Sequence, residues 1–422
     1  MTKYEYLMSL DKVKLVIGNG FDLRCGLYTT YSDYLLDHME VYKHIMRWYN
    51  IYNNTNVFTA NDFYKIINDI NLWDAFFALN ILHNSNQTNF DWFDVERLIL
   101  SSLLTVDDVH NNFDLTSIQM VSIVHWQKIE EMIRKNSGSM YMYENFLKNF
   151  IRMKARSDES KPFDFYGYLL EELQAFERKF GKFVNDQTHN KEKEEESGGG
   201  LVALNKNYID RFNDAVNELC FIKELVSIDS FNYTHPSPNE VGKNIHHING
   251  SYEQPIFGVD SIYFKPDDKR FIFTKTCRRI DADFIEASKD RTPAFRNVVV
   301  YGHSLNEADY NYFFPIFDKL NLLEPNEDKV LVFAYSCYEG ANKESIRRNM
   351  MNNISKIMYR YAESKELKNV ERFLDSLTTQ GKIIIYEIKP FSKNVPNFLD
   401  DHFKPLRESK GKFLEFIKSI SL

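Results

Sequence analysis

Four short polar motifs carry the residues that could do chemistry in this chain. They are Ile17-Gly18-Asn19-Gly20-Phe21-Asp22, Ser230-Phe231-Asn232-Tyr233-Thr234, Ile245-His246-His247-Ile248-Asn249-Gly250-Ser251, and Tyr301-Gly302-His303-Ser304-Leu305 with Asp309. Each motif follows an apolar run and joins small residues to amide, hydroxyl, imidazole or carboxylate groups. Groups of this kind bind nucleotides when they meet at one edge of a sheet. Together the four motifs favour a site for a phosphate-bearing ligand.

The first motif joins a buried strand to the start of a helix. Gly18 and Gly20 allow a tight turn in which backbone N–H groups approach a phosphate closely. The N-terminus of the following helix adds a positive dipole end and further donors. Asn19, Phe21 and Asp22 add polar and stacking groups that a plain turn does not need. The alternative is an ordinary strand-to-helix turn.

The second and third motifs supply an amide and two imidazoles. Asn232 follows a predicted strand, at the end where open α/β sheets bind ligands. His246 and His247 are adjacent on another predicted strand, so their side chains point to opposite faces and do not chelate one metal together. The sequence leaves open which histidine faces the site. The alternatives are a strand-end turn and structural histidines.

The fourth motif also follows a strand and precedes a helix. Gly302 permits close approach of a ligand, and Ser304 can bond a phosphate or ribose oxygen. Asp309 lies inside the following helix. The alternative is a turn in which Ser304 or Asn306 caps the helix.

The elements that position these motifs alternate between strands and helices. Strands are expected at 13–17, 225–230, 244–248, 255–258, 297–300, 330–334 and 382–388, and a helix at 21–36. Between residues 37 and 221 glycine is scarce, and helical spacing recurs at 63–82, 95–104, 117–135, 141–155 and 165–183. The fold class expected is α/β, a Rossmann-like, mostly parallel sheet with a large helical insertion.

The first strand must pair with strands that follow residue 221, which sets the expected domains. Residues 1–36 and 222–422 form a discontinuous nucleotide-binding domain, and residues 37–221 form the insertion. The charged and glycine-rich run near 187–201 predicts an exposed flexible loop within the insertion.

Composition narrows the classes of protein. A net charge of −8 gives no overall basic footprint for nucleic acid. The four cysteines are far apart and form no C-x-x-C pair, which suits a reducing compartment without a thiolate metal site. No apolar run is long enough to span a membrane, and residues 1–14 are too polar for a signal peptide. A cytoplasmic protein that does not bind membranes is expected.

The motifs together resemble the AbiH family of bacteriophage abortive-infection proteins. The stretch from Ile17 to Tyr34, which includes Thr30, matches the opening signature of that family, and Trp92-Phe93-Asp94-Val95-Glu96 resembles its acidic element. The motif order is also similar to that of sirtuin-like NAD-binding domains. The resemblance implies antiviral defence by an effector that binds NAD, as substrate or ligand, and hydrolyses its nicotinamide–ribose bond.

The same resemblance implies roles for individual residues. Asn232 and His247 are the catalytic candidates, and Asp94 and Glu96 a candidate acidic pocket. The nucleotide-binding candidates are Gly18, Asn19, Gly20, Phe21, Asp22, Thr30, Asn249, Gly302, Ser304 and Asp309. Asn249 stands where the family pattern has a histidine before glycine, and His247 lies two residues earlier on the same strand face. No bound metal is expected.

Two other functions stay open at this stage. One is a nucleotide-binding sensor or regulatory module without hydrolysis, which the change at Asn249 motivates. The other is a metal-dependent nuclease-type toxin that uses the acidic residues, since carboxylates can hold Mg²⁺ with few protein ligands. The expected partners are a small-molecule nucleotide, a second copy of the chain, and a phage-derived trigger or neighbouring defence protein.

Overall fold

The structure is a computed structural model, and it describes part of the chain. The described residues are 10–25, 27–43, 45–47, 70–84, 95–111, 164–189, 208–219, 223–236, 245–281, 294–324, 329–337, 342–388, 411–417 and 419. The predicted helices at 117–135 and 141–155, the core of the predicted loop at 190–200, and Asp94 lie outside these residues. None of the described helices is long and apolar enough to cross a membrane.

The chain divides into two compact units. Unit 1 comprises Met1–Thr30, Phe180–Ile256 and Arg278–Leu399, and unit 2 comprises Tyr31–Lys179, Phe257–Cys277 and Asp400–Leu422. The division places residues 180–221, which the sequence assigned to the insertion, with the sheet. It places residues 257–277, which the sequence assigned to the sheet domain, with the helices.

Unit 1 is built on a six-stranded parallel sheet with the order β3-β2-β1-β4-β5-β6. Its strands are β1 (Val13–Ile17), β2 (Leu225–Ser230), β3 (Ile245–His247), β4 (Asn297–Tyr301), β5 (Leu331–Ser336) and β6 (Ile383–Ile388). The α/β class and the parallel sheet are therefore confirmed. The strand predicted at 255–258 was wrong, since these residues have no regular secondary structure.

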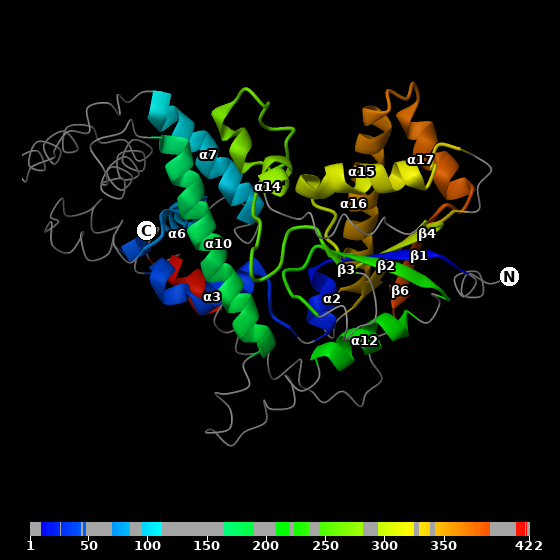
Figure 1. The fold of residues 1–422 in the computed structure, drawn as a ribbon, viewed down its shortest axis with the longest axis horizontal. Helices are drawn as coiled ribbons and strands as arrows, with labels where there is room; N and C mark the ends of the chain where they lie inside the picture. The colour runs from blue at the N-terminus through cyan, green and yellow to red at the C-terminus, as the bar shows by residue number, and fades with distance from the viewer. Residues whose placement is uncertain are drawn as a thin grey trace, which may run out of the picture. The chain divides into compact units, whose positions relative to one another are not determined.

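Helices cover both faces of the sheet, as its nearly continuous apolar strands require. One face packs on α2 (Asn19–Arg24) and α12 (Tyr208–Glu218). The other face packs on α15 (Tyr310–Lys319), α16 (Lys343–Ser364) and α17 (Val370–Thr379), with the 3-10 turn η4 (Glu307–Asp309) before α15. Figure 1 shows α12 and α15 on opposite sides of the strands.

The single helix predicted at 21–36 was wrong, because the structure has two helices there. α2 ends at Arg24, and α3 (Tyr31–Asp37) begins seven residues later. Leu27 donates its N–H to the carbonyl of Asp22, and the hydroxyl of Thr29 donates to the carboxylate of Asp22. These two hydrogen bonds turn the chain back on α2 and prevent one continuous helix.

Unit 2 is helical in its described part. Its elements are α3, α6 (Leu72–Asn84), α7 (Val95–Asn111) and the 3-10 turn η2 (Lys269–Phe273), while α10 (Phe165–His189) and α14 (Lys275–Asp281) contribute residues to both units. Its core is aromatic. The ring of Phe77 packs edge-on against Phe176 at 5.2 Å, and Trp73 against Phe76 at 5.4 Å. Such pairs add specific geometry to a large buried apolar area.

Candidate functional site

The loops after β1 and β4 meet at the carboxyl edge of the sheet. Gly18 donates its N–H to the carbonyl of Tyr301 at 3.1 Å, and Gly20 donates to the carbonyl of Gly302 at 2.8 Å. Phe21 donates in turn to the carbonyl of Gly18. Three backbone N–H groups of the predicted phosphate-binding turn are therefore engaged within the protein.

The glycines of the two loops are needed for this close contact. A Cβ added to Gly18 would lie 2.6 Å from the Cα of His303, and one added to Gly20 would lie 2.8 Å from the Cα of Gly302. Gly302 itself has a φ of 68°, in the region that favours glycine. Packing between the loops thus accounts for these glycines, whatever ligand binds above them.

Asn19 and Phe21 have different environments, although they are near neighbours. Phe21 is completely buried, with its ring 5.0 Å from Phe212 and 5.7 Å from Tyr301, so it belongs to the core. The side-chain Oδ1 of Asn19 is buried and accepts no hydrogen bond from a described residue. A buried acceptor without a donor is costly, and it calls for a ligand or an ordered water.

The loop after β2 is tied to the β1 turn by a buried polar cluster. Asn232 donates from Nδ2 to the carbonyl of Gly18 at 3.0 Å and to Asp22 Oδ1 at 2.9 Å. The hydroxyls of Thr29 and Thr234 donate to Asp22 Oδ2 at 2.9 and 3.0 Å. We call Asp22, Thr29, Asn232 and Thr234 the Asp22 cluster, and all four side chains are buried.

The carboxyl group of Asp22 has no cationic partner in this cluster. Burial raises the pKa of Asp22 from 3.8 to about 7, and the hydrogen bonds from Thr29, Thr234 and Asn232 oppose that shift. Desolvation disfavours the charged form more strongly than neutral donors can stabilise it. Thr30, the predicted binding residue, is half-buried beside Thr29, and Thr29 provides the hydroxyl that reaches Asp22.

The two adjacent histidines point to opposite faces of the sheet edge, as predicted from strand geometry. The ring of His247 stacks on that of exposed His235 at 4.5 Å, and neither of its nitrogens makes a hydrogen bond of normal geometry with a described residue. Burial lowers the pKa of His247 to about 4, helped by His235 and opposed by the nearby backbone of Asn232. His247 is therefore neutral at pH 7.

His246 belongs to a second polar cluster on the α15 side of the sheet. Its Nδ1 lies 3.1 Å from Asp229 Oδ1, while Asp229 Oδ2 pairs with Lys14 at 2.5 Å and accepts from the hydroxyl of Tyr312. Although burial raises the pKa of Asp229, the hydrogen bond from His246 and the charge of Lys14 outweigh it and hold that pKa below its usual value. An ionised carboxylate thus lies inside the sheet domain.

The remaining predicted residues near β3 and β4 are held within the protein. Asn249 is buried, and Arg279 donates to its Oδ1 at 3.0 Å. His303 accepts at Nδ1 from the N–H of Leu305, so its Nε2 carries the proton and lies 3.4 Å from Asp309 Oδ2. Ser304 is exposed on the same turn. Gly18, Asn232 and Gly302 are thus brought together, and no described contact joins Ser304 to them.

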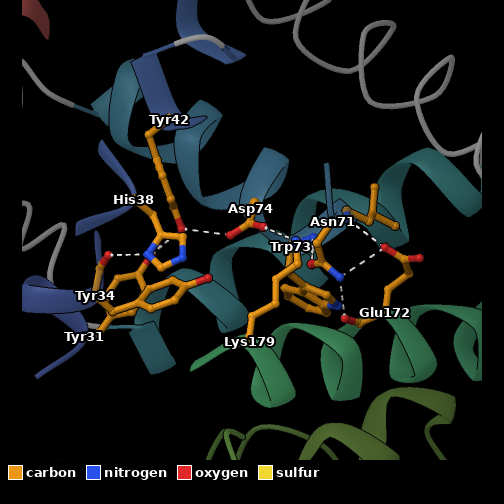
Figure 2. A network of polar contacts seen from close by, with 10 residues as sticks. Tyr31, Tyr34, His38, Tyr42, Asn71, Trp73, Asp74, Glu172 and Lys179 are labelled. Carbon is orange, nitrogen blue, oxygen red and sulfur yellow. Dashed lines mark hydrogen bonds and ion pairs between the residues drawn. The ribbon is translucent and has the colours of Figure 1, made fainter. Parts of the chain in front are cut away.

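Unit 2 contains a separate polar network (Figure 2). Asp74 accepts a hydrogen bond from the hydroxyl of Tyr42 at 3.2 Å and pairs with Lys179 at 3.2 Å. The hydroxyl of Tyr42 also forms a hydrogen bond with that of Tyr31. Burial raises the pKa of Asp74, and the charge of Lys179 opposes the shift. The network joins α3, α6 and α10 from within.

Asn71 and Glu172 fix the start of α6, as Figure 2 also shows. Asn71 accepts from the N–H of Trp73, and Glu172 Oε2 accepts from the N–H of Leu72, both at 2.8 Å. The indole N–H of Trp73 donates to the carbonyl of Leu169. The first two bonds satisfy backbone donors that a helix N-terminus leaves open, and the third fixes the Trp73 side chain, so all three have a structural role.

The candidate acidic pocket is described in part. Glu96, in the first turn of α7, forms an ion pair with the buried ammonium of Lys275. Among the described residues, no group of three His, Cys, Asp or Glu side chains could hold a metal ion.

From the sequence, no role was assigned to five residues of the two clusters in unit 1. They are Lys14, Thr29, Asp229, Thr234 and Tyr312. Two of them carried a usable signal. Lys14 and Asp229 are charged residues inside otherwise apolar strands, and buried charges in proteins are usually paired.

The geometry defines a doubly wound α/β protein whose polar groups gather at the carboxyl edge of a parallel sheet. Residues 15–335 match the model of the family described as bacteriophage abortive infection AbiH, and the chain belongs to that family. This membership supports a role in antiviral defence by abortive infection. No curated protein and no solved structure matched the chain.

Proposed function

We propose that the protein acts in abortive infection by binding NAD or a related nucleotide at the carboxyl edge of its sheet and hydrolysing the nicotinamide–ribose bond. The strand order β3-β2-β1-β4-β5-β6 carries this proposal. It is the order of dinucleotide-binding sheets, and it reverses direction between β1 and β4. Chains leave these two strands toward opposite faces, which makes a crevice where ligands bind.

The polar groups at neighbouring strand ends support the same location. Asn232 follows β2 and contacts the β1 turn, and His247 ends the adjacent strand β3. The buried Oδ1 of Asn19 accepts from no described residue, and the buried nitrogens of His247 make no hydrogen bond of normal geometry with one. A ligand that hydrogen-bonds to them would remove that cost.

The proposed reaction does not need a strong base. The bond from ribose C1′ to nicotinamide breaks first, its electron pair leaves with nicotinamide, and an oxocarbenium-like centre remains, as in glycoside cleavage. Water attacks this centre and loses a proton. A neutral imidazole such as His247 can orient the water and take up the proton, and a strong base is unnecessary because the electrophile is already formed.

The direct test is incubation of purified protein with NAD, with chromatographic detection of free nicotinamide. We expect release by the wild-type chain and loss of release in Asn232→Ala and in His247→Ala. The matched control is Asn352→Ala, on the exposed face of α16. Absence of nicotinamide, also when phage lysate is added as a trigger, contradicts hydrolysis.

A second function rests on Asn249. This residue replaces the histidine of the family pattern, and its Oδ1 is held by Arg279, so it offers no proton acceptor for catalysis. A nucleotide-binding sensor without turnover fits that change. Calorimetry that shows NAD binding without nicotinamide release supports the sensor, and turnover that Asn232→Ala abolishes excludes it. Either function is proposed to operate in the cytoplasm, under control of a phage-derived trigger or a neighbouring defence protein.

A further inference from the structure

We infer that Asp22 is a positioning residue that locks the carboxamide of Asn232 in one orientation, so that Asn232 meets a ligand only as a hydrogen-bond acceptor. The inference rests on the proposed function in one respect, namely that a ligand lies at this edge of the sheet. The locking itself is a property of the protein alone.

The orientation follows from what surrounds the amide. Asn232 Nδ2 carries two hydrogens, which it donates to the carbonyl of Gly18 at 3.0 Å and to Asp22 Oδ1 at 2.9 Å. The carbonyl of Gly18 cannot donate at any pH, and the carboxyl group of Asp22 cannot donate once it is ionised, above its pKa of about 7. Turning the amide over would bring its Oδ1 against these acceptors and would leave both N–H groups unused. Because Asn232 is buried, water cannot replace the two hydrogen bonds that this rotation of the amide would break.

Asp22 is itself fixed by two hydroxyls from different segments. Thr29, after α2, donates to Oδ2 at 2.9 Å, and Thr234, after β2, donates to the same oxygen at 3.0 Å. A carboxylate with two oxygens can accept all of these bonds at once. The carboxylate of Asp22 therefore joins the β1 turn, the α2 helix and the β2 turn. Any other rotamer of the Asn232 side chain would make fewer hydrogen bonds than this one.

The consequence concerns the chemistry of the ligand. Both hydrogens of Asn232 Nδ2 are engaged, and no described residue donates to its Oδ1. This amide thus presents its oxygen rather than its N–H groups. A hydroxyl, a water or an amide N–H of the ligand can meet this oxygen, whereas a phosphate or carboxylate oxygen would face acceptor against acceptor. This edge selects a donor-bearing part of the ligand.

The locking can be tested without a ligand by NMR of the full chain with ¹⁵N-labelled asparagine. The side-chain NH₂ signals of Asn232 are assigned by their absence from Asn232→Ala. Above the pKa of Asp22, at about pH 8, we expect both hydrogens to be slow in exchange with water in the wild-type protein and fast in Asp22→Ala. In Asp22→Asn, which keeps an acceptor oxygen toward Asn232, slow exchange is retained.

Thr29→Val is the matched control. It removes one hydrogen bond to Asp22 and leaves the contact with Asn232, so a general loosening of the cluster speeds exchange in this variant as well. The positioning role predicts slow exchange in Thr29→Val. Fast exchange of both hydrogens in the wild type, or unchanged exchange in a folded Asp22→Ala, overturns the inference. Should Asp22→Ala not fold, the wild-type and Asp22→Asn measurements still decide it.

Calorimetry with NAD separates this inference from the proposed function. We expect binding by the wild-type chain and about tenfold weaker binding by Asp22→Ala, the loss of about one well-placed hydrogen bond. A wild-type chain that does not bind NAD refutes the proposed function, while slow exchange at Asn232 still supports the locking. Equal affinity of both proteins for NAD, together with fast exchange in Asp22→Ala, refutes the role of Asn232 toward the ligand.

Discussion

Replacing Asp22 by asparagine should change how the stability of the protein depends on pH. The pKa of Asp22 lies at about 7 in the fold, compared with 3.8 for an ordinary aspartate, because the carboxyl group is buried among neutral donors. Between these values the folded state holds a proton that the unfolded state has released. The free energy of unfolding therefore falls as pH rises through this window, and Asp22 has no further effect above about pH 7.

The size of the effect follows from the shift. A displacement of about three pKa units corresponds to about 4 kcal/mol, at about 1.4 kcal/mol for each unit. Roughly 2 to 3 kcal/mol of this is lost between about pH 5 and about pH 8, a range in which most proteins can be measured. Asp22→Asn is close in shape and does not titrate, so it should lack this loss.

Urea unfolding followed by intrinsic fluorescence provides the assay. The wild-type chain, Asp22→Asn and the control Glu371→Gln, on the exposed face of α17, are compared at several pH values. We expect Asp22→Asn to gain roughly 2 to 3 kcal/mol relative to the wild type from about pH 5 to about pH 8, and the control to follow the wild type. A constant difference between wild type and Asp22→Asn over this range would refute the reasoning.

Three further predictions concern the sheet domain. Lys14→Met leaves the buried carboxylate of Asp229 without its cation, and it should lower the free energy of unfolding in urea by about 3 to 5 kcal/mol. Adding Asp229→Asn should restore part of this stability. No recovery in the double variant would argue against the ion pair as the cause. Gly20→Ala places a methyl group 2.8 Å from the Cα of Gly302 and should cost about 1 to 3 kcal/mol, seen as a lower Tm, whereas an unchanged Tm would show that the loops can separate cheaply. The ring of His247 should titrate near pH 4 in NMR, because it is buried, and a midpoint at the usual value for histidine would contradict its burial.

The strands β1, β4, β5 and β6 of unit 1 could be predicted from sequence because they are mostly apolar on both faces. Runs such as Val13–Ile17 and Asn297–Tyr301 stand out against the helical segments, and the separation of β1 from β2 predicted a discontinuous domain. The break between α2 and α3 could not be predicted in the same way. It depends on Thr29 reaching back to Asp22, and a helical pattern of apolar residues carries no trace of that bond.

The candidate site shows the same limit. The residue types at the strand ends indicated where polar groups would gather, and Asn232 does contact the β1 turn. The directions in which these side chains point depend on partners that are far away in the sequence. Gly18 and Gly20 were interpreted as residues of a phosphate-binding turn. In the structure the loop after β4 fills the space that a Cβ at either position would need. Asp22 was interpreted as a ligand contact, and in the structure it is buried and accepts a hydrogen bond from Asn232.

Lys14 has a consequence for how the chain folds. It lies in the centre of the sheet, yet its partner Asp229 is 215 residues further along the chain. Contacts between such distant residues form slowly, because a long loop must close first. Until then the five-residue segment Val13–Ile17 is an exposed strand of high β-propensity, the kind of segment that associates with other chains. We expect the ammonium group of Lys14, at the second position of this segment, to disfavour that association while the segment is unpaired. The same charge that needs Asp229 in the folded sheet should therefore oppose aggregation of the nascent chain.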